Sequence, residues 1–286
     1  MNAIKHLYVP APDQLLYHYT SFETANLILN SNSFRLSEYT MLNDESEFKY
    51  AKSVFIDEMK KRRVYVDAGI RALLAMTFPA FTKKTVMLVG SMTENRDDVS
   101  MWDRYAEHGS GCVLGLEATW LLNFAGVALR KIVYEEDYLR NFTNATLRML
   151  NENFETSKID PNETVRLVGL LIADLFSFKD PRFNSEQEIR ISRLVLADEA
   201  TSTGLMDSSG HTSVGAILEP LQIGQRIGQY GTTRFLDLPL GTSNANSAIK
   251  SIGLGPKCSL GKNAIYDLLG RTANGVQIWK SDLPLR

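Results

Sequence analysis

Runs of apolar residues, some alternating with polar residues and some continuous, predict a series of strands along the chain. The apolar and aromatic run from Gln14 to Thr20 predicts a first strand, and Phe34-Arg35-Leu36 predicts a short second one. The β-branched, apolar run from Thr85 to Thr93 predicts a central strand. Further strands are predicted at 111–116, 127–134, 186–191, 249–254 and 276–279.

Capping signals and a 3.6-residue apolar period predict helices between these strands. Thr20-Ser21-Phe22-Glu23 and Asp44-Glu45-Ser46-Glu47 are both typical of a capping box at a helix start. A helix over Asp97–Ala106 is predicted to stop at Gly109, because glycine is favoured just after a helix. Two helices are predicted from Glu135 to Lys179, separated near Asp160-Pro161, and another over 259–269. Segments 201–213 and 241–247, rich in Ser, Thr and Gly, are predicted to be loops.

The order of these elements predicts an α+β fold. Strands and helices interleave without a regular β-α-β period, and no internal repeat is visible. We expect a single domain over residues 1–286, with the helical block at about 135–180 inserted on a mixed sheet. The length alone also permits two domains.

Composition narrows the class of protein. A chain of 286 residues with 44% hydrophobic residues and a net charge of -2 is typical of globular proteins. A pI near 6.1 argues against a globally basic nucleic-acid binder, and no apolar run reaches the roughly 18 residues that span a bilayer. With no signal-peptide pattern near residue 1, we expect a cytoplasmic protein. Cys112 and Cys258 lack the spacing of a zinc or disulfide framework, so no metal is expected.

Common catalytic signatures are absent from the sequence. There is no Gly-x-Ser-x-Gly elbow, no His-Glu-x-x-His helix and no Gly-x-Gly-x-x-Gly after a strand. The segment Gly255 to Asn263 resembles a phosphate loop, but it has one residue too many, and Asn263 replaces the hydroxyl residue that would hold magnesium. We therefore reject a nucleotide loop there, while anion binding at a helix N-terminus stays open.

Polar and aromatic residues gather instead at the predicted ends of strands and on one helix. The alternation of 186–191 places Glu186, Glu188 and Arg190 on one face of a half-buried strand. The remaining candidates are His18, Tyr19, Thr20, Ser91, Thr93, Trp102 and Tyr105.

These motifs resemble a known family. The resemblance rests on Leu16-Tyr17-His18-Tyr19-Thr20-Ser21, Asn43-Asp44 with Glu47, Ser100-x-Trp102-x-x-Tyr105 before Gly111, Phe183-x-x-Glu186-x-Glu188-x-Arg190, and Ser281-x-x-Pro284. Together they resemble the uncharacterised prokaryotic domain-of-unknown-function family 2971, nearly end to end. The chain departs from that family at Glu45, where proline is usual, and at Met101, and both departures concern local loop geometry.

The order of the motifs is also similar to that of the ADP-ribosyltransferase superfamily. There a first-strand His or Arg, a middle polar or aromatic residue and a late Glu bind NAD. The resemblance implies a split mixed β-sheet core with helical insertions and an enzyme that transfers ADP-ribose from NAD, without a metal, to an unknown macromolecular or small-molecule acceptor. Family context suggests phage defence or toxin pairs, in which an inhibitory partner holds the activity in check.

The resemblance also implies roles for individual residues. Glu188 would lie beside the ribose and stabilise its oxocarbenium-like transition state. Glu186 would orient or activate the acceptor, and His18 would hydrogen-bond the adenosine ribose, with the two residues after it, Tyr19 and Thr20, also in the cofactor site. Such a site requires the strand that carries His18 to lie beside the strand that carries Glu188.

The aromatic and middle-strand roles stay open. Tyr105 is our first choice to stack on nicotinamide, with Tyr39 and Tyr19 as alternatives. Ser91 and Thr93 instead resemble the Ser-Thr-Ser element of the toxin-like branch, which pairs it with a first-strand Arg that this sequence lacks.

Plainer interpretations compete with each of these roles. His18 alone is typical of a strand-edge histidine, and Glu186, Glu188 and Arg190 are also typical of a solvent-facing charged ladder. Tyr105, three residues after Trp102, is explained equally by packing against the sheet. Two rival functions follow: an NAD glycohydrolase, in which water attacks the ribose, and a non-catalytic binding or effector module.

Overall fold

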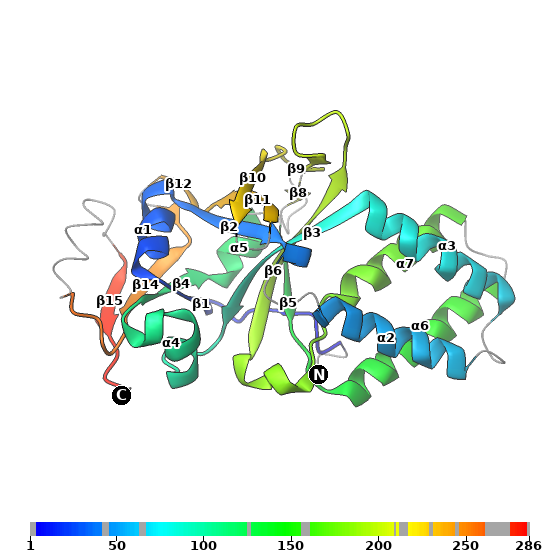
Figure 1. Ribbon diagram of the computed structural model, residues 1–286, viewed down its shortest axis with the longest axis horizontal. Helices are drawn as coiled ribbons and strands as arrows, with labels where there is room; N and C mark the ends of the chain where they lie inside the picture. The colour runs from blue at the N-terminus through cyan, green and yellow to red at the C-terminus, as the bar shows by residue number, and fades with distance from the viewer. Residues whose placement is uncertain are drawn as a thin grey trace.

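The computed structural model describes residues 4–41, 46–62, 67–124, 127–155, 161–208, 210–211, 217–228, 231–243, 246–260 and 275–284. It shows a mixed α+β chain with a large, mostly antiparallel 11-stranded sheet and helices interspersed along the sequence. Figure 1 shows long helices gathered at one end of the molecule and most of the sheet toward the other. The expected α+β class is thereby confirmed.

The main path through the sheet follows eight strands in the order β10-β11-β2-β3-β1-β4-β14-β15. Their bounds are β1 (Leu15–Thr20), β2 (Ser33–Glu38), β3 (Thr85–Thr93), β4 (Cys112–Glu117), β10 (Ile223–Gly228), β11 (Gly231–Pro239), β14 (Ile249–Leu254) and β15 (Gln277–Lys280). Off this path, β6 (Glu188–Ala197) pairs with β3, β5 (Ala128–Lys131) and β7 (Leu205–Met206). β14 and β15 run parallel, whereas the other pairs described in this sheet are antiparallel.

Strand β3 is the branching point of the sheet. One of its edges pairs with β6 along its whole length, from Thr85 to Thr93. Its other edge is shared, because β2 pairs with Leu88 and Val89 while β1 pairs with Thr93. Strands β1 and β2 therefore diverge beside residues 90–92. The ring of Phe34 fills this fork, and a Cβ added to Gly90 would lie 2.4 Å from Phe34 Cε1. The close approach of the ring explains why residue 90 is a glycine.

The two largest of the four hydrophobic clusters among the described residues form the main cores of the molecule. The larger core lies on the sheet and includes Leu16, Leu88, Leu114, Ile189 and Ile191, all fully buried. The second core lies among α2 (Ser46–Lys61), α3 (Ala68–Lys84), α6 (Glu136–Glu155) and α7 (Pro161–Leu175). We call these four helices the helical lobe. The two helices predicted between 135 and 179 are confirmed as α6 and α7, and Pro161 begins α7 as expected.

The lobe is larger than the helical block expected at about 135–180, because α2 and α3 come from residues 46–84 and pack against α6 and α7. The one-domain organisation stays a prediction.

Shorter helices connect the strands: α1 (Phe22–Ser31), α4 (Val99–Tyr105), α5 (Ala118–Phe124) and the 3₁₀ turns η1 (Tyr39–Met41), η2 (Glu107–Gly109) and η3 (Pro181–Glu186). Ser21 caps α1 by accepting from the backbone N–H of Thr24 at 3.0 Å. The cap thus lies one residue later than the predicted box from Thr20 to Glu23. Asp98 caps α4, close to the predicted start.

Several predicted boundaries are wrong. Segments 201–213 and 241–247 are not only loops, because they contribute short strands: β7, β8 (Gly210–His211), β12 (Gly241–Ser243) and β13 (Asn246–Ser247). Strand β8 pairs with β9 (Ile217–Leu218). The strand predicted over 127–134 is shorter, since β5 spans Ala128–Lys131. The capping side chains predicted at 44–47, most of the predicted helix 259–269 and the end of the phosphate-loop-like segment lie outside the described residues.

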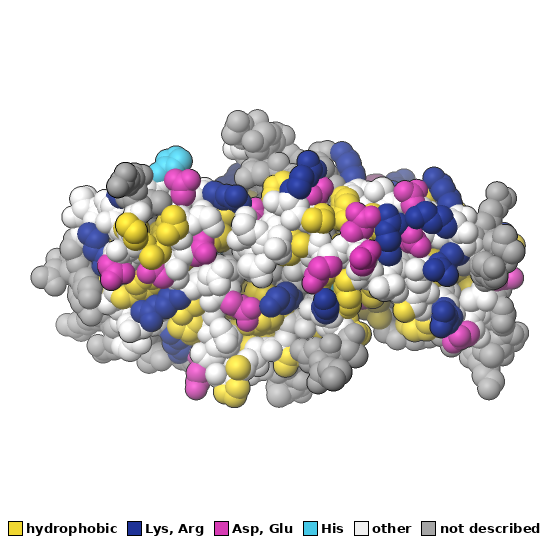
Figure 2. Space-filling model, turned by 90° about the horizontal axis from the view of Figure 1, so that it is seen from below, with side chains coloured by type: hydrophobic (Ala, Val, Ile, Leu, Met, Phe, Trp, Pro, Cys, Tyr) yellow, Lys and Arg dark blue, Asp and Glu magenta, His cyan; other side chains and the backbone are white. Residues whose placement is uncertain are grey.

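On the face seen in Figure 2, cationic and anionic side chains are interspersed over the helical lobe and the sheet. The coloured part of that face therefore carries no continuous stripe of one sign. In the described part of the chain, no helix has the length and apolar character needed to cross a membrane.

Candidate functional site

The two candidate carboxylates come from different elements. η3 begins at Pro181 and ends at Glu186, Gln187 takes a left-handed conformation with φ 43°, and β6 then begins at Glu188. The observed strand therefore starts at Glu188, two residues later than the strand predicted over 186–191. The 3₁₀ turn, started by proline and capped by the Asp180 side chain, keeps Glu186 off the face that Glu188 and Arg190 share.

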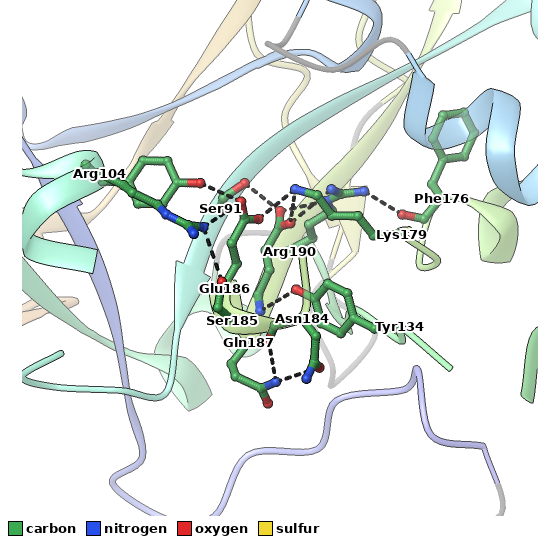
Figure 3. A network of polar contacts seen from close by, with 12 residues as sticks. Ser91, Arg104, Tyr134, Phe176, Lys179, Asn184, Ser185, Glu186, Gln187 and Arg190 are labelled. Atoms are coloured by element: carbon green, nitrogen blue, oxygen red, sulfur yellow. Dashed lines mark hydrogen bonds and ion pairs between the residues drawn. The ribbon is translucent and has the colours of Figure 1, made fainter. Parts of the chain in front are cut away.

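Glu188 is buried and accepts hydrogen bonds on both carboxylate oxygens. Its partners Ser91, Arg190 and Lys179 are labelled in Figure 3. Oε1 accepts from Ser91 Oγ at 2.6 Å and from Arg190 Nε at 2.7 Å. Oε2 accepts from Arg190 Nη2 at 3.0 Å and lies 3.5 Å from Lys179 Nζ. Burial alone would raise the pKa of Glu188, but the charges of Arg190 and Lys179 and the hydrogen bonds outweigh it and lower the pKa to about 2. Glu188 is thus a fixed anion at neutral pH.

Glu186 is also buried and faces the same lysine. Lys179 Nζ donates to Glu186 Oε2 at 2.6 Å, and the Tyr105 hydroxyl donates to Glu186 Oε1 at 2.7 Å. Arg104 Nη1 lies 4.0 Å from Glu186 Oε1. Lys179 therefore sits between the two carboxylates and reduces their mutual repulsion.

Arg190 connects this site to the helical lobe. Its Nη1 donates to the backbone oxygen of Phe176 at 2.8 Å, just past the end of α7, and its guanidinium lies 5.1 Å from the centre of the Tyr39 ring. The interpretation of a solvent-facing ladder is therefore wrong for Glu188 and Arg190, which are 4% and 2% exposed. Residues after α7 cover this face of the sheet.

His18 lies at the fork between β1 and β2. Its Nδ1 is 3.0 Å from the backbone oxygen of Ser91. Its ring packs edge-on against the Phe34 ring, with 4.9 Å between the two ring centroids. Because a carbonyl only accepts, Nδ1 carries the proton and Nε2 is left as an acceptor. Burial lowers the pKa of His18, although the hydrogen bond to Ser91 opposes this. His18 is therefore a neutral imidazole at pH 7.

Ser91 joins His18 to Glu188. The expected adjacency of their strands is wrong, because β3 lies between β1 and β6. Ser91, on β3, accepts from His18 through its backbone oxygen and donates to Glu188 through its hydroxyl. The three residues thus form a line across three successive strands.

Other residues predicted to contact the cofactor have different surroundings from the carboxylates. Tyr19 is buried against Trp102, donates to the backbone oxygen of Asn95 at 3.0 Å and accepts from the backbone N–H of Asp98 at 3.0 Å. It lies on the face of β1 opposite to His18. Thr20 and Thr93 are buried as well. The structure therefore does not bring Tyr19 to the carboxylates.

The three tyrosines proposed for stacking differ in exposure. Tyr105 is 40% exposed, whereas Tyr39 and Tyr19 are 2% and 4% exposed. Burial and the Glu186 carboxylate raise the pKa of Tyr105, so it stays protonated and donates to Glu186. Of the three rings, Tyr105 is the one that a ligand can reach from solvent.

Two residues of this site were not predicted. Lys179 is buried between the carboxylates, and Tyr134 OH accepts from the backbone N–H of Glu188 at 3.0 Å. A lysine directly after the mostly apolar stretch Leu175-Phe176-Ser177-Phe178 and shortly before two candidate carboxylates was the available signal. The sequence contained no such signal for Tyr134, because aromatic residues are common in strands whether or not they belong to a site.

Within the described residues, no group of three or more His, Cys, Asp or Glu side chains is arranged to hold a metal ion.

Comparison with known proteins finds similarity to one family model. No curated protein and no solved structure matches the chain significantly. A family model described as "Protein of unknown function (DUF2971)" matches residues 101–191. This stretch is shorter than the nearly full-length resemblance expected from the sequence. It contains Tyr105, Glu186, Glu188 and Arg190 but not His18 or Ser91.

Proposed function

We propose that this chain consumes NAD in the manner of an ADP-ribosyltransferase, with Glu188 as a fixed carboxylate beside the reacting ribose. The observation that supports this most is the line from His18 through Ser91 to Glu188 on three successive strands. It brings together a first-strand histidine, a middle hydroxyl and a late glutamate, the three positions that the motif order suggests. The branching at β3 is consistent with the split sheet of that superfamily.

The chemistry suits an ionised carboxylate. The bond from ribose C1′ to nicotinamide breaks with its electron pair moving to nicotinamide, and positive charge develops on the ribose. A negative group fixed nearby stabilises that charge without reorganisation. Since the pKa of Glu188 is about 2, this residue contributes charge and does not transfer a proton. The acceptor then bonds to C1′ and passes its proton to Glu186, which Tyr105 and Lys179 hold in place.

The nature of the acceptor distinguishes a transferase from a glycohydrolase. Incubation of the protein with NAD carrying a label in its adenosine half, followed by separation of small molecules from macromolecules, measures both outcomes. Label on a macromolecule indicates transfer, whereas free ADP-ribose without other acceptors indicates attack by water. No nicotinamide release under either condition would contradict the proposal.

A second candidate is a non-catalytic binding module. It is favoured by the saturation of the carboxylates, because each oxygen of Glu186 and Glu188 already has an internal donor or cation. In that case the polar cluster stabilises the junction of sheet and lobe. Such a module would release no nicotinamide, and replacing Glu188 would change its stability alone.

A further inference from the structure

Arg104 stands at the solvent-exposed edge of the carboxylate cluster. It lies in the last turn of α4, and its side chain is 48% exposed. Its Nη1 donates to Ser185 Oγ at 3.2 Å and lies 4.0 Å from Glu186 Oε1. Among the residues that the structure describes, Nε and Nη2 of Arg104 take part in no hydrogen bond. A guanidinium has five N–H donors, so most donors of Arg104 have no hydrogen-bond partner among the described residues.

The charges of the cluster leave one cation in surplus. Glu186 and Glu188 carry two negative charges, while Lys179, Arg190 and Arg104 carry three positive ones. Lys179 and Arg190 are buried and closely paired with the carboxylates. The unbalanced charge is therefore the one at the surface, on Arg104.

Neighbouring groups leave this cation available. The nearest other carboxylate on α4, Asp103, lies 2.9 Å from His108 Nδ1. Ser185 Oγ accepts from Arg104 and therefore keeps its own proton to donate. Both Arg104 and Ser185 are exposed, and both point toward the same edge of Glu186 in Figure 3. Together they offer an anion several charge-assisted and neutral donors from two elements.

We propose that Arg104 and Ser185 form an anion subsite that binds a phosphate of the dinucleotide, and this assignment rests on the proposed function of the site. The guanidinium donates two parallel N–H bonds to the phosphate oxygens, and the Ser185 hydroxyl donates a third. The pyrophosphate then lies over α4 and η3, on the opposite side of the carboxylates from the lobe. The ribose is thereby directed toward Glu188 and Ser91.

Binding of ADP-ribose and of adenosine to the full chain, measured by calorimetry, tests this subsite without requiring turnover. We expect Arg104→Gln to weaken ADP-ribose binding by about tenfold or more, the worth of a lost charge-assisted pair, and to leave adenosine binding unchanged. Arg182→Gln is the matched control: this arginine of η3 is exposed and already paired with Asp180 at 2.8 Å. The control should bind both ligands as the wild type does.

The outcomes separate this subsite from the proposed function. Equal ADP-ribose affinity for Arg104→Gln and wild type would overturn the subsite, as would equal losses for ADP-ribose and adenosine, or no binding of ADP-ribose by the wild type. If the wild type consumes no NAD while Arg104 still governs ADP-ribose binding, the subsite stands and the enzymatic proposal fails. If NAD is consumed with an unchanged KM in Arg104→Gln, the subsite fails alone.

Discussion

Glu188 and Arg190, two residues apart on one face of β6, form a buried bidentate ion pair, with Nε–Oε1 and Nη2–Oε2 distances of 2.7 and 3.0 Å. Arg190 also binds the backbone oxygen of Phe176. One guanidinium therefore holds both the candidate carboxylate and the end of the helical lobe. Loss of Arg190 leaves the buried Glu188 without its closest counterion.

We expect Arg190→Met to destabilise the fold by about 3–5 kcal/mol, because Glu188 loses its closest cation while it stays buried. Urea unfolding at pH 7 measures this change. Arg182→Met removes an equally bidentate but exposed partner of Asp180, and it should cost only about 0.2–1 kcal/mol. Similar losses in the two variants would contradict the buried pair.

Acidification should weaken the fold through Glu188. The folded pKa is about 2, below the ordinary value of 4.5 that the unfolded chain has, so the unfolded state binds a proton first as the pH falls. The stabilisation from Glu188 is thus complete above about pH 5 and is lost as the pH falls toward 2. The gap in unfolding free energy between wild type and Glu188→Gln should shrink over this range. A gap independent of pH would show that Glu188 has an ordinary pKa.

His18 should titrate below its usual range, because burial disfavours the imidazolium form. An NMR titration of the ring protons measures its midpoint, expected below 6.5. Since the unfolded chain takes up this proton first, the contribution of His18 to stability is lost as the pH falls below 6.5. A midpoint above 6.5 would contradict the partly buried position of the ring at the fork.

Replacing His18 tests its hydrogen bond at the same fork. His18→Ala leaves the Ser91 carbonyl without this donor and should cost about 0.5–1.5 kcal/mol in unfolding free energy, the worth of one ordinary hydrogen bond. Chemical denaturation measures the loss. An unchanged stability would mean that water replaces the imidazole at no cost.

The packing of the fork itself can be tested at Gly90. A methyl group there would meet Phe34 Cε1 at 2.4 Å, so Gly90→Ala should destabilise the fold by about 1–3 kcal/mol through overpacking. Gly228→Ala is the control, because its nearest neighbour, Gly231 O, would be 3.8 Å from the added atom. Thermal unfolding of both variants should show a loss at Gly90 alone.

Periodicity predicted the elements whose faces are simple. Strand β3 spans the predicted Thr85–Thr93 and β14 the predicted Ile249–Leu254. Helix α3 was not predicted, because it holds Pro79 in its interior and is apolar around much of its surface. Strands β10 and β11 were not predicted either, since Gly224, Gly228 and Gly231 weaken a strand pattern.

The candidate site shows where a local pattern stops being informative. The spacing of Glu188 and Arg190 correctly placed both on one face of a strand, but the pattern of alternation could not tell whether that face meets solvent or protein. The covering residues, Phe176 and Lys179, follow a helix of the lobe whose position depends on long-range packing. Likewise, nothing local in the sequence indicated that Ser91 would lie between His18 and Glu188.

Nicotinamide release by Glu188→Gln, measured under single-turnover conditions beside NAD binding, tests whether the Glu188 carboxylate stabilises the reacting ribose. Glutamine keeps the size of the side chain and removes its charge, and circular dichroism verifies that the variant is folded. Because the carboxylate acts on the transition state, we predict that release falls by about 10²–10³-fold while NAD affinity is largely retained. Release at the wild-type rate by the folded variant would contradict the role of Glu188.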